Sequence, residues 1–112
     1  MMKVGFIGLG VQGKYLAINL AEAGYDLMAY DLRSEPLSEV VARGAKKASS
    51  NREIGAHGEV VCICVLNGQQ TLEVVLAPDG VLATAQPGSV IAIHGTIAVS
   101  YTHLRAHETG RN

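Results

Sequence analysis

The sequence predicts an α/β fold in which a parallel β-sheet is covered by helices on both faces. Short apolar runs of strand length alternate five times with segments of helical periodicity along the chain. The run EVVCICV at residues 59–65 is almost wholly apolar, which is typical of a central parallel strand buried on both faces. Because this alternation is typical of doubly wound sheets, we expect a single domain of that class.

The chain begins with a strand, a glycine-rich turn, a helix and a second strand. Residues 3–7 are a short apolar run, and residues 8–13 have the sequence GLGVQG, which is the G-x-G-x-x-G pattern. From Gln12 the apolar residues take helical spacing. The expected inward face consists of Tyr15, Leu16, Ile18, Asn19, Leu20 and Ala23. Gly24 is expected to end this helix, and residues 25–30 form the next strand.

This arrangement predicts a Rossmann-type dinucleotide site. Gly8 permits a tight turn, Gly10 lets a pyrophosphate approach the backbone, and Gly13 allows the helix to pack closely. The N-terminus of the helix offers N–H groups and a partial positive charge to the phosphates. Asp31 lies 18 residues beyond Gly13, close to the roughly 20 expected for an acid that accepts hydrogen bonds from the adenosine ribose. Two alternatives stay open: glycines that serve only the turn, and a site for another adenosine ligand such as S-adenosylmethionine.

The middle of the chain continues the alternation. A helix is expected to begin at Ser34, which is placed to cap it, and to end at Gly44, before a strand of at most residues 45–48. Its expected inward residues are Leu37, Val40 and Val41. The sequence SNRE at residues 50–53 forms a capping box for a brief helix, after which His57 is expected to lie in a solvated loop.

The last part of the domain should contain two more helices and a final strand. A helix is expected over residues 69–76, a short one over 81–85 and a strand over 89–94. The first of these should direct Leu72, Val75 and Leu76 inward. In such a fold ligands bind beyond the carboxyl ends of the strands, which here means the glycine turn, Asp31, residues 65–68 and residues 94–96. His94 either contacts the ligand or is a strand-end residue with a satisfied hydrogen bond.

The choice between NAD and NADP stays open at this level. Asp31 should repel a 2′-phosphate and accept hydrogen bonds from ribose hydroxyls, which favours NAD. Arg33, two residues further on, could turn toward the 2′-phosphate of NADP.

Residues 5–31 resemble the opening of the β-hydroxyacid dehydrogenases, which include 3-hydroxyisobutyrate dehydrogenase, tartronate semialdehyde reductase and, more distantly, 6-phosphogluconate dehydrogenase. The family signature is roughly G-F-I-G-L-G-x-M-G-x-x-M-A-x-N-L. It is matched at Phe6, Ile7, Gly8, Leu9, Gly10, Gly13, Ala17, Asn19 and Leu20. Gln12 and Leu16 replace its two methionines. The resemblance implies that NAD, or NADP, is held by Gly8, Leu9, Gly10, Val11, Gln12, Gly13, Asp31, Arg33, Val65, Leu66 and Thr96.

The resemblance also implies that the parent protein is an oxidoreductase that transfers a hydride between the nicotinamide cofactor and a small 3-hydroxyacid. It covers about residues 2–98, which correspond to the cofactor domain. The catalytic Lys and the Ser-Gly-Gly substrate loop of the family lie further on, so no catalytic residue is assigned here. We therefore expect this chain to bind the dinucleotide without turnover, with the hydroxyacid as a partner only of the full-length parent. The alternative is a stand-alone dinucleotide-binding regulatory module.

Residues 99–112 differ in character from the rest of the chain. The sequence SYTHLRAHET resembles a peptide translated from sequencing-adapter DNA, so we expect a domain over residues 1–98 and a non-native tail over 99–112. His103 and His107 have metal-ligand spacing. The order of H-E-x-x-H and a third ligand are missing, however, and no metal site is predicted.

Composition narrows the function further. Nine Lys and Arg residues balance ten Asp and Glu, and there is no Trp, which argues against nucleic-acid or membrane-surface partners. No apolar run approaches the roughly 20 residues of a membrane span. Cys62 and Cys64 are expected to face opposite sides of the sheet and to remain free thiols, which indicates a reducing cytoplasm.

Overall fold

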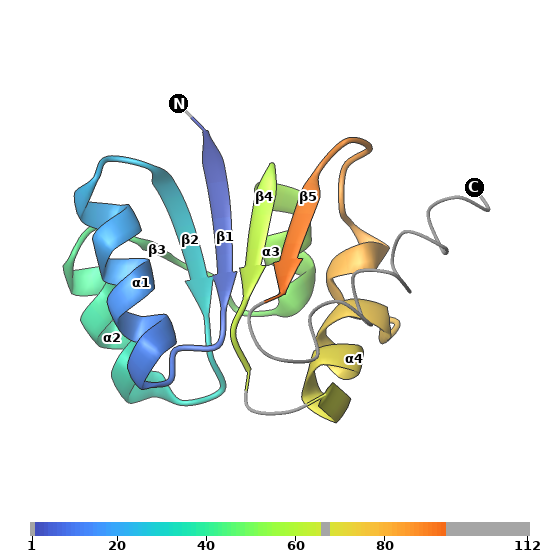
Figure 1. Cartoon of the computed structure of the whole chain (residues 1–112), viewed down its shortest axis with the longest axis horizontal. Coiled ribbons are helices and arrows are strands. Elements are labelled where there is room, and N and C mark those ends of the chain that lie inside the picture. The colour runs from blue at the N-terminus through green and yellow to red at the C-terminus, as the bar shows by residue number, and fades with distance from the viewer. Residues whose placement is uncertain (1, 66–67, 94–112) are drawn as a thin grey trace.

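The computed structural model describes residues 2–65 and 68–93, and within them it confirms the α/β class. Five parallel strands form one sheet in the order β3-β2-β1-β4-β5 (Figure 1). The elements are β1 Lys3–Ile7, α1 Val11–Glu22, β2 Asp26–Tyr30, α2 Ser34–Ala42, β3 Lys46–Lys47, α3 Asn51–His57, β4 Val60–Ile63, α4 Gly68–Leu76, the short 3₁₀ helix η1 Val81–Ala83, and β5 Val90–Ile93.

The first strand lies at the centre of the sheet. Ile7, at its carboxyl end, is level with Tyr30 of β2 on one side and with Ile63 of β4 on the other. From β1 the chain runs outward through β2 to β3, and it then crosses back to form β4 and β5. The direction of winding therefore reverses beside β1, and the carboxyl ends of β1 and β4 border the place where this fold holds ligands.

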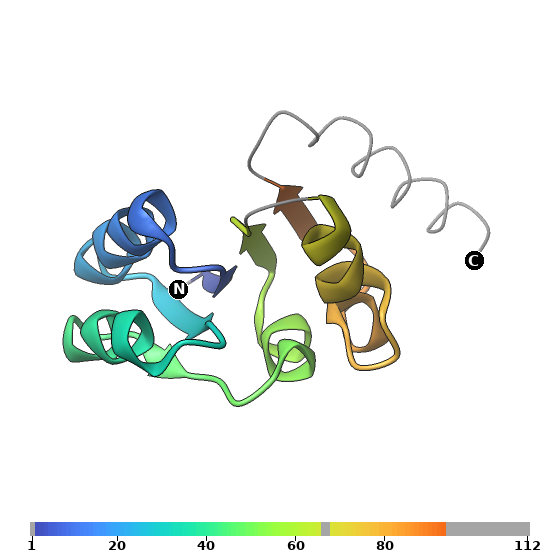
Figure 2. The ribbon, with the colours of Figure 1, turned by 90° about the horizontal axis from the view of Figure 1, so that it is seen from below.

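Two hydrophobic clusters fill the space above and below the sheet. Phe6 and the buried hydrophobic side chains of α1 and α2 belong to the first cluster. Ile63 and the buried hydrophobic side chains of α3, α4 and η1 belong to the second. The helices α1 and α2 lie side by side, and α4 lies at the other end of the molecule (Figures 1 and 2). Helices thus cover both faces of the sheet, as the sequence predicted.

The inward face of α1 differs from the prediction. Its buried residues are Gly13, Ala17 and Ile18, whereas Tyr15 is 61% exposed. Leu16 is also exposed. Small residues bring the helix axis close to the sheet, so the longer side chains are directed outward along the flanks of the helix. Gly24, at φ 96°, ends α1 as expected, because its amide donates to Ala21 and the amide of Tyr25 donates to Leu20.

The other helices differ from the predictions in smaller ways. Arg33, not Ser34, is the N-cap of α2, and it makes no side-chain capping bond. On α4 the buried residues are Thr71, Val74 and Val75, whereas Leu76 is exposed. The apolar residues of α4 are so closely spaced that helical periodicity alone did not decide which of them face the sheet.

The segment around α3 is close to its prediction at the N-terminus but not at the C-terminus. Ser50 Oγ accepts the amide of Glu53 at 3.3 Å, and the Glu53 carboxylate accepts the Ser49 amide at 2.8 Å. His57 is the last residue of α3 and does not lie in a solvated loop. Its side chain is only 9% exposed, with Nε2 2.9 Å from the carbonyl oxygen of Asp26.

The expectation that the two cysteines face opposite sides of the sheet is wrong. Cys62 and Cys64 both pack against the first hydrophobic cluster, because residues two apart on a strand share a face. Both are free, and burial raises the pKa of each thiol.

Several predicted features lie outside the described residues. These are Leu66, His94, Thr96 and the whole segment 99–112, including His103 and His107. In the part of the chain that the structure describes, the longest helix falls well short of what a membrane crossing requires in length and apolar character.

Candidate dinucleotide-binding site

The glycine turn joins β1 to α1, and its first and third glycines are required by the packing of the chain itself. Gly8 adopts φ 96°, and a Cβ there would run into the carbonyl oxygen of Cys64. A Cβ on Gly13 would run into the carbonyl oxygen of Gly8 and lie 3.4 Å from the Phe6 ring. The close approach of α1 to β1 and β4 therefore requires both glycines.

Gly10 differs from its two neighbours in the motif. Its φ of −65° is open to any residue, and a Cβ there would meet no atom of the described residues within 4 Å. Gly10 is also the N-cap of α1, its carbonyl oxygen accepts the Lys14 amide at 2.7 Å, and the first turn of α1 carries no acidic residue. Within residues 2–65 and 68–93, neither packing nor backbone conformation explains a glycine here. The free space lies at the positive end of a helix, where an anionic group fits.

The turn is tied to the end of β2 by two successive backbone amides. The Gly8 amide donates to the Tyr30 carbonyl oxygen at 3.1 Å, and the Leu9 amide donates to Asp31 Oδ2 at 2.6 Å. The Leu9 side chain is buried in the first cluster, so Leu9 meets the site through its backbone. Asp31 thus holds the glycine turn in place, a role that its position in the sequence did not reveal.

The Asp31 carboxylate is also bound by Arg33. The Arg33 backbone amide donates to Oδ1 at 2.8 Å, Nε to Oδ1 at 3.2 Å and Nη2 to Oδ2 at 3.3 Å. The Asp31 side chain is 9% exposed. Burial favours its protonated form, but the hydrogen bonds from Arg33 and Leu9 outweigh this effect, and the net pKa of Asp31 is lowered. Asp31 is therefore an ionised acceptor in this site at neutral pH.

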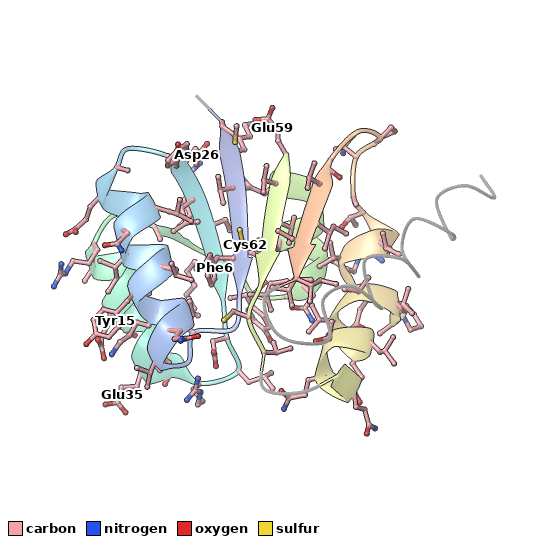
Figure 3. The ribbon with its side chains drawn as sticks, in the orientation of Figure 1. Phe6, Tyr15, Asp26, Glu35, Glu59 and Cys62 are labelled. Carbon is pink, nitrogen blue, oxygen red and sulfur yellow. The ribbon has the colours of Figure 1, made fainter. Side chains whose placement is uncertain are left out.

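A groove of about 520 Å³ begins at the turn and runs between α1 and α2. Its lining residues are Leu9, Gly10, Val11, Lys14, Arg33, Ser34, Glu35, Pro36 and Glu39. Lys14 Nζ on α1 lies 3.0 Å from Glu39 Oε2 on α2, and this hydrogen bond raises the pKa of Lys14. Glu35 projects at the same end of the molecule (Figure 3). The groove thus connects the helix N-terminus with the end of β2.

The predicted site residues are brought together where the structure describes them. The turn itself consists of residues Gly8 to Gly13, and Asp31 and Arg33 lie beside the turn and the groove. Val65 also lies next to the turn, because its Cγ1 would be 3.1 Å from a Cβ on Gly8. Val11 and Gln12 are exposed beside the turn. Leu66 and Thr96 fall outside the described residues. The sequence analysis did not identify Lys14 and Glu39 as residues of the site. The position of Lys14 directly after the last glycine of the motif could have indicated that it lies there.

Comparison with known proteins bears on what this site holds. The model of the family described as the NAD binding domain of 6-phosphogluconate dehydrogenase matches residues 3–112. The chain is 35% identical to 2-(hydroxymethyl)glutarate dehydrogenase of Eubacterium barkeri over 90% of its own length and 34% of that protein. It is 38% identical to NAD-dependent L-serine dehydrogenase of Pseudomonas aeruginosa, over 98% of the chain and 38% of that protein.

A solved structure gives the same picture of the fold. The structure of Mycobacterium tuberculosis 3-hydroxyisobutyrate dehydrogenase with L-serine matches with a TM-score of 0.80 and 26% identity, over 96% of this chain and 38% of that one. The chain therefore spans little more than a third of the length of each of these three proteins.

Proposed function

This chain belongs to the family of the NAD binding domain of 6-phosphogluconate dehydrogenase, and from that premise we propose that it is the cofactor-binding part of a dehydrogenase acting on a small 3-hydroxyacid. The observation that carries the proposal is the open space in front of Gly10, at the N-terminus of α1 and beside the ionised Asp31. These features suit an adenosine diphosphate group, because the helix N-terminus can bind its pyrophosphate and a carboxylate can accept a hydrogen bond from its ribose.

Each residue of the site has a separate task in this proposal. The backbone from Gly8 to Gly13 and the dipole of α1 hold the pyrophosphate. Asp31 accepts a hydrogen bond from the adenosine ribose in place of one of the two that the Arg33 guanidinium donates. The proposal also assigns cofactor contacts to Val65, Leu66 and Thr96, of which only Val65 is among the described residues. When bound, the nicotinamide ring supplies the chemistry, because it accepts or returns a hydride. This chain contributes binding and orientation, and we assign no residue to the proton transfer.

The substrate class is inferred from the substrates named for three of the similar proteins. 2-(Hydroxymethyl)glutarate, L-serine and 3-hydroxyisobutyrate are all carboxylic acids with a hydroxymethyl group on the carbon next to the carboxylate. We therefore assign the parent protein to substrates of this kind. Since the chain spans about a third of those relatives, we expect it to bind the cofactor without oxidising the acid.

Titration of the 112-residue chain with NADH tests the proposal directly. We expect saturable binding, seen as a change in nicotinamide fluorescence or as heat, which S-adenosylmethionine does not displace. No NADH binding, or displacement by S-adenosylmethionine, would contradict a dinucleotide site. Reduction of NAD by the chain with 3-hydroxyisobutyrate or L-serine would contradict the expected lack of turnover.

A further inference from the structure

The groove between α1 and α2 carries two cations, and each is already held by a carboxylate. Arg33 is bound to Asp31, and Lys14 is bound to Glu39. We propose that Glu39 is a specificity-determining residue, which holds Lys14 so that the groove accepts NAD and disfavours NADP. This inference rests on the proposed function, because it assumes that the groove receives the adenosine half of a dinucleotide.

The balance of charge along the groove supports this role. Lys14, Arg33, Glu35 and Glu39 all line it, so its ionisable side chains sum to zero, and Asp31 next to it adds a negative charge. A phosphate monoester carries about −1.5 to −2 charges at neutral pH. To be stabilised it must either meet an unpaired cation or separate one from its carboxylate. Among the described residues that line the groove, both cations are paired.

The two pairs differ in how readily they separate. Arg33 binds Asp31 through its backbone amide and through two guanidinium nitrogens, and the same carboxylate holds the Leu9 amide. Separating the Arg33 guanidinium would therefore remove two hydrogen bonds from the carboxylate that holds the glycine turn. Lys14 is joined to Glu39 by one contact of 3.0 Å, and the Glu39 side chain is 50% exposed, so water can solvate it after separation. Lys14 is thus the cation that a change at Glu39 would release without altering the turn.

This assignment changes where selectivity is expected to arise. Sequence reasoning placed it at Asp31, whose negative charge should repel a 2′-phosphate. In the structure that charge is largely balanced by the Arg33 guanidinium. The carboxylate of Glu39 both occupies Lys14 and adds a negative charge to the groove, so it has two independent ways of disfavouring a phosphate.

Dissociation constants for NADH and NADPH, measured by fluorescence titration of the whole chain at fixed low ionic strength, test the inference. The variants are Glu39→Gln, Lys14→Gln and the double variant. The matched control is Glu22→Gln, which removes the same charge and breaks another ion pair, Glu22 Oε2 to Arg43 Nη1 at 2.9 Å. Glu22 and Arg43 lie at the far ends of α1 and α2, so this control changes the helix pair without touching the groove.

We expect the wild-type chain to bind NADH more tightly than NADPH. Glu39→Gln should tighten NADPH binding about tenfold relative to NADH, which is the order of effect expected when one repulsive charge is removed and one attractive charge is released in the groove that would receive the phosphate. The gain should be lost in the double variant and should shrink as salt is added. A gain of affinity cannot arise from a loss of folding, so misfolding of the variant cannot imitate this result.

Three results would overturn the inference. They are an unchanged ratio of the two constants in Glu39→Gln, an equal change in Glu22→Gln, and a gain that persists after Lys14 is also replaced. In each of these cases NADH still binds and the proposed function stands. If neither dinucleotide binds the wild-type chain, the proposed function fails, and the inference fails with it.

Discussion

Replacing Gly10 by Ala separates the needs of folding from the needs of binding. The added methyl group meets no atom of the described residues within 4 Å, and a φ of −65° is as acceptable for Ala as for Gly. In the part of the chain that the structure describes, nothing therefore resists the substitution. In the proposed function the same space is where the pyrophosphate lies against the backbone, so the methyl group should interfere with the ligand alone.

The magnitudes follow from these two environments. For folding, Ala is a somewhat poorer N-cap than Gly, but it lowers the entropy of the unfolded chain by an amount worth about 0.4–1 kcal/mol. The two effects oppose each other, and the free energy of unfolding should change by less than about 0.5 kcal/mol. For binding, forcing one methyl group into a filled contact costs about 1–3 kcal/mol, which weakens affinity roughly 5- to 150-fold.

Urea denaturation and NADH titration of the same protein measure both quantities. The matched control is Gly24→Ala at the opposite end of α1, where φ is 96° and a Cβ would likewise meet no described atom within 4 Å. That variant should lose about 1 kcal/mol of stability through backbone strain and should keep its affinity for NADH. The reasoning would be refuted if Gly10→Ala bound NADH as tightly as the wild type while remaining folded.

Three further predictions concern the neighbourhood of the site and the core. Gly13→Ala should lose at least about 1–3 kcal/mol in urea denaturation, because its Cβ would run into the Gly8 carbonyl oxygen; a wild-type midpoint would show that α1 does not pack as described. Asp31→Asn should be less stable than wild type at pH 7. Since the folded pKa of Asp31 is lowered, its contribution is present above the unfolded value of about 3.9 and is lost as pH falls through the folded pKa. The difference in urea midpoint between the two proteins should therefore shrink from pH 7 to pH 3, and a constant difference would contradict this reading. Ser50→Ala should lower the free energy of unfolding by about 1 kcal/mol, because it removes the acceptor for the Glu53 amide at the start of α3. Ser50→Thr keeps a hydroxyl acceptor and should therefore retain most of the stability of the wild type.

Much of the fold follows from patterns that act over a few residues. The G-x-G-x-x-G turn, the helix stop at Gly24 and the Ser50 cap are local, because each depends on backbone conformation and on hydrogen bonds between near neighbours. These were predicted correctly. The inward faces of α1 and α4 were predicted less well. Which side chains are buried there depends on how closely each helix approaches the sheet, and small residues such as Gly13 and Ala17 determine that approach.

The site divides in the same way. The position of Asp31 at the end of β2 could be predicted, because it depends only on the length of one strand–helix–strand unit. Its bonds to the Leu9 amide and to Arg33 could not be predicted, since they depend on the exact conformation of two loops that meet at the sheet edge. The Lys14–Glu39 pair likewise depends on how α1 and α2 lie against each other, and no spacing within a single helix encodes that arrangement.

The central place of β1 has a consequence for how the chain is made. On one side β1 pairs with β2, which follows after a single helix, but its other partner, β4, leaves the ribosome much later. During synthesis the unit β1–α1–β2 can form early, with one edge of β1 still unpaired and Ile7, which belongs to the second cluster, still uncovered. The dinucleotide turn is complete within that unit, so we expect a nascent chain to form the turn before the sheet that supports it is closed.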